Sequence, residues 1–199
     1  MADQQGGKDT KATGSTGRKQ NLILRRYWEI LNLYPEITDE GLAERIEEFT
    51  LNATPEQLFR MQKLVIGYGA DYMAKDPRWR KILEKMDGEK VGLAIGLDYS
   101  STVSLNDYEF KVKMGIEDNS IPVLSVASRQ DYIDALLRRK DIIRMLVTRK
   151  LKATRKMTLV RWGLSFFDLI KDQELFDDLV SHQAVAEKSI AEVMKEMDF

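Results

Sequence analysis

Residues 108–116, YEFKVKMGI, decide how the rest of the sequence is interpreted. Apolar side chains stand at every second position, with charged residues or glycine between them. A strand with one buried face and one solvated face has this period of two. The same alternation over residues 91–99 predicts a second strand, joined to the first through residues 100–107 as a meander. Residues 121–127, IPVLSVA, predict a third strand, and LKATR at 151–155 is a candidate fourth.

Outside these segments the apolar residues recur at helical spacing, so the predicted fold class is α+β. We expect a small, mostly antiparallel sheet covered on one face by helices, with an N-terminal helical extension. Residues 1–20 are polar and predict a disordered tail, and residues 21–88 predict the N-terminal helical region. Residues 89–171 contain the expected α/β domain, and the acidic residues 172–199 predict C-terminal helices.

Several helices have recognisable starts. Thr54 and Gln57 have the spacing of a capping box, and Pro55 stands at the first helical position, where proline is favoured. Asp76 and Ser128 are placed to begin two later helices, because their side-chain oxygens can accept hydrogen bonds from the first turn.

The composition argues against several classes of protein. With 31 Lys and Arg against 32 Asp and Glu, the charge is nearly balanced and does not indicate bulk nucleic-acid binding. The chain has no cysteine and a single histidine, His182, which argues against thiol chemistry, catalytic triads and histidine-rich metal sites. We therefore expect no enzyme activity, no cofactor and no metal. Lacking a bilayer-spanning apolar run or a signal-peptide core, the chain is expected to be soluble and cytoplasmic.

Apolar side chains are in surplus around the small sheet. They form either a packed core or the wall of a cavity, and the sequence leaves both alternatives open. The nine methionines suit either, because a flexible thioether lines an adaptable apolar site as readily as it fills a gap.

Charge is segregated along the chain. Residues 138–161 hold ten basic side chains against Asp141 alone, while residues 36–56 and 172–199 are acidic. Three interpretations compete: pairing of the basic segment with the acidic helices, attraction to anionic headgroups or phosphates, and RNA binding. RNA is the weakest of these, because aromatic residues are not interleaved with the basic ones as a stacking platform requires.

The order of elements resembles the sterol carrier protein type 2 family. The resemblance is carried by residues 128–170, SRQDYIDALLRRKDIIRMLVTRKLKATRKMTLVRWGLSFFDLI, and extends over about residues 76–170. A serine-started helix, a short helix, a strand and an amphipathic helix follow in the family's order. Residues that stand in the family's strand and helix pattern are Lys150, Leu151, Lys152, Met157, Leu159 and Leu164. Arg149 and Arg155 stand where the family usually has glycines.

The resemblance implies a hydrophobic tunnel between sheet and helices that binds a fatty acid, acyl-CoA or sterol-like lipid without chemical conversion. The candidate ligand-binding residues are Phe110, Val112, Met114, Val126, Tyr132, Leu136, Met145, Leu146, Leu164 and Phe167. The candidate headgroup residues are Arg144, Arg149 and Lys150, which also suggest an anionic membrane surface as a partner. The alternative is an interaction or scaffold domain whose groove is filled by its own helix or a partner's; a homodimer is left open.

Overall fold

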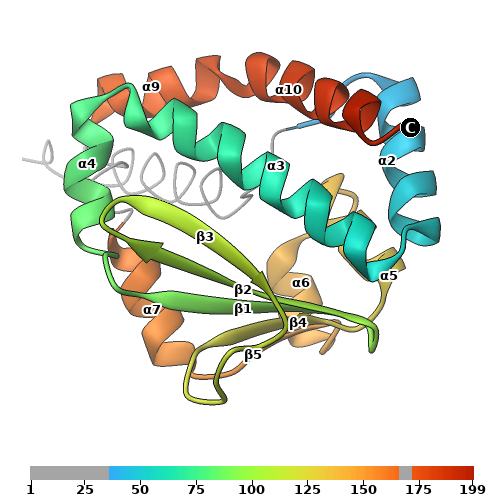
Figure 1. The fold of residues 1–199 in the computed structure, drawn as a ribbon, viewed down its shortest axis with the longest axis horizontal. Helices are drawn as coiled ribbons and strands as arrows, with labels where there is room; N and C mark the ends of the chain where they lie inside the picture. The colour runs from blue at the N-terminus through green and yellow to red at the C-terminus, as the bar shows by residue number, and fades with distance from the viewer. Residues whose placement is uncertain (1–35, 166–171) are drawn as a thin grey trace, which may run out of the picture. The chain divides into compact units, whose positions relative to one another are not determined.

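The fold is organised around a five-stranded sheet, seen in the lower part of Figure 1. The computed structural model describes residues 36–165 and 172–199, which belong to one compact unit. The strands are β1 (Lys90–Ile95), β2 (Tyr99–Asn106), β3 (Glu109–Met114), β4 (Val123–Val126) and β5 (Leu151–Ala153). Their order is β3-β2-β1-β4-β5; β1 and β4 pair in parallel, and the other neighbours are antiparallel. The α+β class expected from the sequence is confirmed.

The strand expected over residues 91–99 is in fact two strands. β1 ends at Ile95, Gly96 takes a φ of +61°, and Tyr99 opens β2. The apolar alternation continues through this turn only because Leu97 is apolar, and its side chain is fully exposed. Most of the expected connection is therefore β2, which pairs with both β1 and β3. The third expected strand is β4, which pairs in parallel with β1 on the side opposite β2.

The helices surround this sheet. They are α2 (Glu40–Asn52), α3 (Pro55–Ala74), α4 (Pro77–Glu84), α5 (Arg129–Leu136), α6 (Ile142–Val147), α7 (Lys156–Ser165), α9 (Gln173–Ser181) and α10 (Gln183–Glu196). The capping box before α3 is confirmed: the Gln57 N–H donates to the Thr54 hydroxyl, and the Thr54 N–H donates to the Gln57 side chain. Asp76 and Ser128 cap α4 and α5 as expected.

One sheet face is covered by α2, α3, α5 and α10 (Figure 1). Ile95, Tyr99 and Val126 from the sheet are buried there against Phe49 of α2 and Met194 of α10. α2, α3 and α10 therefore share one apolar core with the sheet.

Some surface residues have left-handed backbone conformations in tight turns. Tyr108 has a φ of +66° beside Asp107 at +53° in the β2–β3 hairpin, where a turn of this type favours glycine. A left-handed conformation costs a non-glycine residue about 1–2 kcal/mol. Arg149 and Arg155, at the positions where the sterol carrier family usually has glycines, have φ values of +60° and +44°. Their turns therefore keep the backbone that glycine adopts most easily.

Arg129, the first residue of α5, links three parts of the chain. Its Nη1 group donates to the carbonyl oxygens of Thr50 at 3.0 Å, Leu51 at 3.1 Å and Ala53 at 2.6 Å. These oxygens lie at the end of α2, where helical N–H partners run out and a cation is favoured. Its Nη2 group donates to Asp98 in the β1–β2 turn, which holds the pKa of that carboxyl below its usual value.

Replacing Arg129 by methionine should lower the free energy of unfolding by about 2–3 kcal/mol, because carbonyl oxygens and a carboxylate lose a charged donor together. Urea denaturation measures the change. Arg144→Met is the matched control: Arg144 is exposed and forms no ion pair within the described ranges, so its loss should cost less than about 0.5 kcal/mol. Equal effects of the two substitutions would show that Arg129 does not hold these elements together.

Candidate functional site

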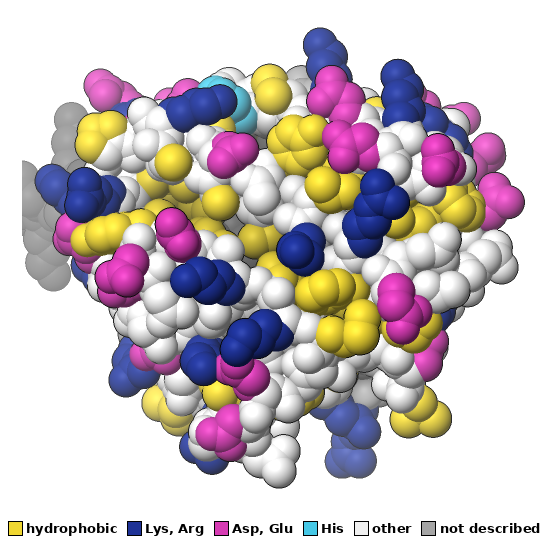
Figure 2. Space-filling view, viewed as in Figure 1, with side chains coloured by type: hydrophobic (Ala, Val, Ile, Leu, Met, Phe, Trp, Pro, Cys, Tyr) yellow, Lys and Arg dark blue, Asp and Glu magenta, His cyan; other side chains and the backbone are white. Residues whose placement is uncertain are grey.

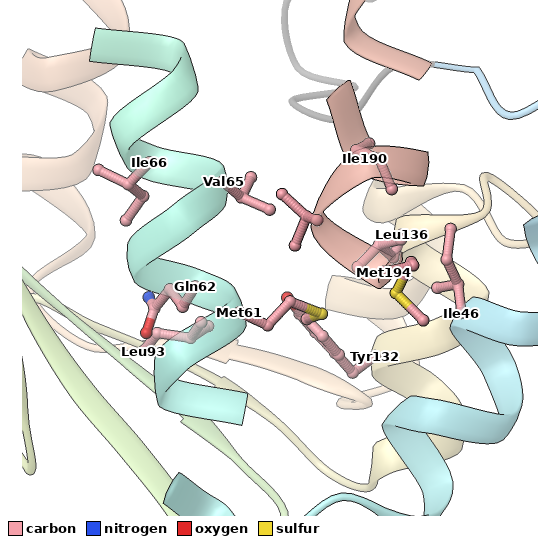
Figure 3. Close-up of a pocket in the computed structure, with 11 residues that line it drawn as sticks. Ile46, Met61, Gln62, Val65, Ile66, Leu93, Tyr132, Leu136, Ile190 and Met194 are labelled. Carbon is pink, nitrogen blue, oxygen red and sulfur yellow. The ribbon is translucent and has the colours of Figure 1, made fainter. Parts of the chain in front are cut away.

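An apolar pocket of about 120 Å³ lies between α3, α10, α5 and the sheet (Figure 3). Its lining consists of Ile46, Met61, Gln62, Val65, Ile66, Leu93, Tyr132, Leu136, Ile190, Val193 and Met194. We call this space the α3–α10 pocket. Every lining side chain except Gln62 is apolar or aromatic.

Two amphipathic helices supply most of the lining. On α3, Met61 and Val65 are four residues apart and therefore lie on the same helical face. On α10, Ile190 and Met194 have the same spacing, and in Figure 3 the two pairs lie on facing sides of the pocket. Leu93 of β1 reaches the pocket from the sheet.

The polar contact at the pocket edge is made by Gln62. The hydroxyl of Tyr99, a buried residue at the start of β2, donates to the Gln62 side-chain oxygen. The oxygen of the Gln62 side chain is thus already engaged by a residue of the sheet.

α10 is held across the pocket by contacts near both of its ends. Near its start, the Glu187 carboxylate accepts from the backbone N–H groups of Thr38 at 2.6 Å and Asp39 at 2.8 Å. Near its end, Arg60 of α3 donates to the Glu196 carbonyl oxygen at 3.1 Å. The ring of Phe199 packs edge-on against Phe49 of α2, with 5.0 Å between centroids.

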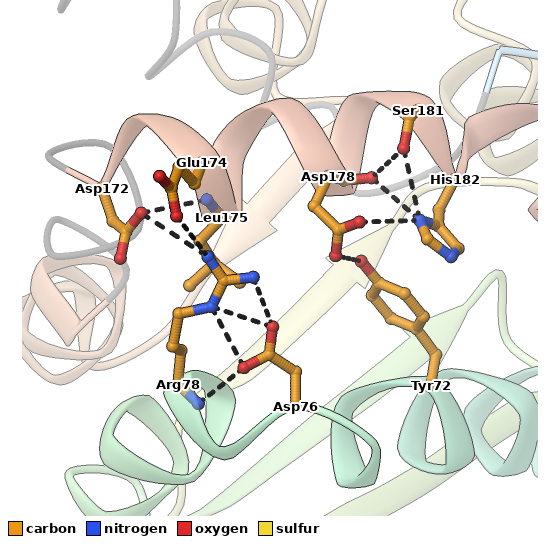
Figure 4. Close-up of polar contacts among 9 residues, drawn as sticks. All are labelled: Tyr72, Asp76, Arg78, Asp172, Glu174, Leu175, Asp178, Ser181 and His182. Atoms are coloured by element: carbon orange, nitrogen blue, oxygen red, sulfur yellow. Dashed lines mark hydrogen bonds and ion pairs between the residues drawn. The ribbon is translucent and has the colours of Figure 1, made fainter.

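The junction of α9 and α10 is fixed to α3 by a polar cluster (Figure 4). The Tyr72 hydroxyl donates to the Asp178 carboxylate at 3.0 Å, and burial together with this carboxylate raises the pKa of Tyr72 to about 12. The His182 ring lies 4.5 Å from the Tyr72 ring, and its Nδ1 atom lies 2.9 Å from the Asp178 carbonyl oxygen. Nearby, Arg78 of α4 reaches Glu174 of α9 at 3.7 Å.

The sequence-predicted ligand residues occupy several environments. Tyr132 and Leu136 line the α3–α10 pocket, and Val126 and Met145 are buried in the core beside it. The residues outside this group are Phe110, packed against a second core cluster; Val112, half-buried; and Met114 and Leu146, which are 46% and 37% exposed. Leu164 belongs to α7, and Phe167 lies outside the described residues.

The candidate headgroup residues also differ among themselves. Arg144 and Arg149 are exposed, whereas Lys150 donates to the Asp131 carboxylate at 2.7 Å. Burial alone would raise the pKa of Asp131, but hydrogen bonds from Lys150 and Ser128 leave it below its usual value. Elsewhere in the basic segment Arg139 pairs with Glu47 of α2 at 2.6 Å, so part of this charge is paired within the fold.

Sequence reasoning missed the contributions of α3 and α10 to the pocket. The signal was present as apolar residues at helical spacing, as in Met61 with Val65 and Ile190 with Met194. The same spacing occurs on every amphipathic helix, so it could not show which faces would leave space between them.

No protein-family model matches the chain, and no curated protein matches it. A solved structure titled "UbiJ-SCP2 Ubiquinone synthesis protein" is similar over 51% of this chain and 87% of that chain. The sequence identity is 10% and the TM-score is 0.36, so this is a remote structural neighbour. Within residues 36–165 and 172–199, no helix has the length and apolar character to cross a membrane. The same ranges contain no cluster of three His, Asp or Glu side chains suited to a metal ion.

The attachment of α10 through Glu187 should depend on pH. The hydrogen bond from the Asp39 N–H, followed by that from Thr38, holds the pKa of Glu187 below its usual value. The contribution to stability is therefore present above the usual glutamate pKa of about 4.3 and is lost as the pH falls through the lowered pKa. Glu187→Gln should cost about 1 kcal/mol at pH 7.

Urea denaturation at a series of pH values from 7 to 3 provides the measurement. The difference between the unmodified protein and Glu187→Gln should shrink as the pH falls through the lowered pKa of Glu187, because both proteins then carry an uncharged side chain at this position. Glu192→Gln removes a charge from an exposed position of the same helix and should change stability little. A constant difference across the pH range would contradict the assignment.

Proposed function

We propose that the chain binds an apolar ligand, such as a fatty acid or a sterol-like lipid, in the α3–α10 pocket without converting it chemically. The observation that carries the proposal is the convergence of apolar side chains from α2, α3, α5, α10 and the sheet on one space, with the side chain of Gln62 at its edge. Binding sites for small apolar ligands have this composition. The proposal assigns binding roles to these residues and a catalytic role to none.

The volume of the pocket sets how such a ligand would bind. An engineered apolar cavity of about 150 Å³ binds benzene, so a 120 Å³ pocket has room for about six carbon atoms. At about 0.8 kcal/mol per buried methylene, six carbons contribute about 5 kcal/mol, which corresponds to near-millimolar affinity before ordering costs. A sixteen-carbon chain offers on the order of 10 kcal/mol but needs more space. Tight binding of a long chain therefore requires the pocket to widen.

α10 is the element that could widen the pocket. Its polar contacts at Glu187 and Glu196 lie near its two ends, while Val193 and Met194 fill the groove between them. Met194 and Met61 have flexible side chains that can repack around a ligand without a change of backbone. We infer that a long chain enters along α10 and displaces these side chains.

A second candidate function follows from the same helix. Val193 and Met194 are almost completely buried, so α10 already occupies an apolar groove formed by α2, α3 and α5. An interaction domain whose groove is filled by its own helix would have this arrangement. In that case α10 has a structural role and the remaining pocket is a packing imperfection.

The substitution Val65→Phe distinguishes the two candidates. The added ring occupies the pocket, so stability should change by less than about 1 kcal/mol, whereas a tightly packed core would lose about 1–3 kcal/mol. In Val65→Phe, the affinity for a fluorescent fatty acid, measured by fluorescence titration, should fall at least tenfold. Val180→Phe, at an exposed position on α9, should alter neither property. Failure of the unmodified protein to take up the fatty acid would exclude the carrier function and favour the interaction domain.

We further propose that α6 and the turn after it approach an anionic membrane. Exposed Leu146 and Val147 lie between exposed Arg144 and Arg149, a combination suited to an apolar interface with acidic headgroups.

Arg149→Glu should weaken binding to phosphatidylserine vesicles by about 1–2 kcal/mol, and added salt should reduce the difference. Vesicle co-sedimentation measures this. Lys81→Glu, the same charge reversal on α4, should have little effect on vesicle binding. Equal losses of binding in the two variants would show that net charge, and not this surface, determines the attraction.

A further inference from the structure

A second and larger hollow, of about 360 Å³, lies between the end of α3, α4 and the β2–β3 hairpin. Its volume falls in the range of small-molecule sites. In Figure 2 the molecule is hollowed between α3 and β3, and hydrophobic side chains surround the hollow. Met73, Leu83 and Phe110 form an apolar wall that belongs to a core cluster separate from the α3–α10 pocket.

A cation stands at the edge of this hollow. The guanidinium of Arg80, on α4, lies over the ring of Tyr108 with its central carbon 4.6 Å from the ring centroid. Arg80 is exposed, and no carboxylate in the described part of the chain forms an ion pair with it. A planar guanidinium held against an aromatic ring is oriented before any ligand arrives, and its free edge suits a carboxylate or phosphate.

The acidic group in the hollow is already satisfied. Both carboxylate oxygens of Asp76 accept from the Arg78 Nε group, at 3.1 Å and 2.9 Å, and one also accepts from the Arg78 backbone N–H at 2.8 Å. Glu84 accepts a hydrogen bond of 3.2 Å from the Tyr108 hydroxyl. Glu84 keeps its negative charge, because the hydroxyl that donates to it is neutral. Of the two charged residues that line the hollow, Asp76 is paired with Arg78, so Arg80 is the lining cation available to an anionic ligand.

The backbone supplies an independent observation. Tyr108 has the left-handed φ of +66° in a hairpin turn that glycine would satisfy without strain. A bulky residue in this conformation is an outlier, and such outliers concentrate at ligand sites. Here the unfavourable position places the aromatic ring beneath Arg80 and against the hollow.

From these observations we propose that the hollow binds a small amphipathic anion, with a flat apolar body against Met73, Leu83 and Phe110 and its carboxylate or phosphate on Arg80. This site is separate from the α3–α10 pocket and does not depend on the function proposed for that pocket.

Isothermal titration calorimetry of the full chain with 2-naphthoate tests the proposal. Arg80→Gln should weaken binding about tenfold, the loss expected for a partly exposed charged hydrogen bond. Lys81→Gln removes the same charge from the next position of α4 and should leave the affinity unchanged. Neutral 2-naphthalenemethanol should bind more weakly than naphthoate and should not respond to Arg80→Gln. 2-Naphthyl phosphate, titrated in parallel, separates phosphate from carboxylate ligands, and either anion supports the proposal if its affinity depends on Arg80.

Tyr108→Gly separates a binding role from a packing role. Glycine relieves the left-handed strain, so the melting temperature should stay the same or rise, while naphthoate affinity falls. Val65→Phe, in the other pocket, should leave naphthoate binding intact. The proposal is overturned if no naphthyl anion binds, if Arg80→Gln and Lys81→Gln have equal effects, or if Val65→Phe abolishes binding.

Discussion

The guanidinium of Arg129 is the contact on which the arrangement of the helices and the sheet depends. The side chain donates hydrogen bonds to carbonyl oxygens at the end of α2 and to Asp98 in the β1–β2 turn, and Arg129 itself is the first residue of α5. These three segments are far apart in sequence, and without a shared donor the oxygens at the end of α2 would be left largely to solvent. α2 and α5, which this contact joins, both contribute side chains to the α3–α10 pocket.

α10 is held by a different combination of contacts. Apolar side chains such as Met194 fill the centre of the groove, and polar contacts at Glu187 and Glu196 lie near the ends. Apolar burial supplies most of the favourable free energy but little direction, whereas the end contacts fix the position of the helix along its axis. Such an arrangement keeps α10 in register while the methionines beneath it remain adaptable.

Much of the fold could be predicted from local patterns, whereas of the predicted ligand residues only Tyr132 and Leu136 line the α3–α10 pocket. The alternation over residues 108–116 identified β3, and the Thr54 capping box located the start of α3, because both signals are contained in a few neighbouring residues. The parallel pairing of β1 with β4 joins distant segments and has no such local signal. Alternation also gave the correct face for Met114, but it cannot show how far a helix extends over that face, and this side chain is nearly half exposed. The pocket is a space between surfaces, which no single segment encodes.

α3 runs from the α3–α10 pocket to the second hollow, with apolar side chains at each hollow and two glycines in the turn between them. Met61 and Val65 face the α3–α10 pocket, Met73 faces the second hollow, and Gly67 and Gly69 lie between. A Cβ atom at either glycine would meet no neighbouring atom within 4 Å, so close packing does not require glycine there. Each glycine weakens a helix interior by about 0.5–1 kcal/mol relative to alanine. By helix propensity alone, the turn between the hollows is therefore the least favourable part of α3.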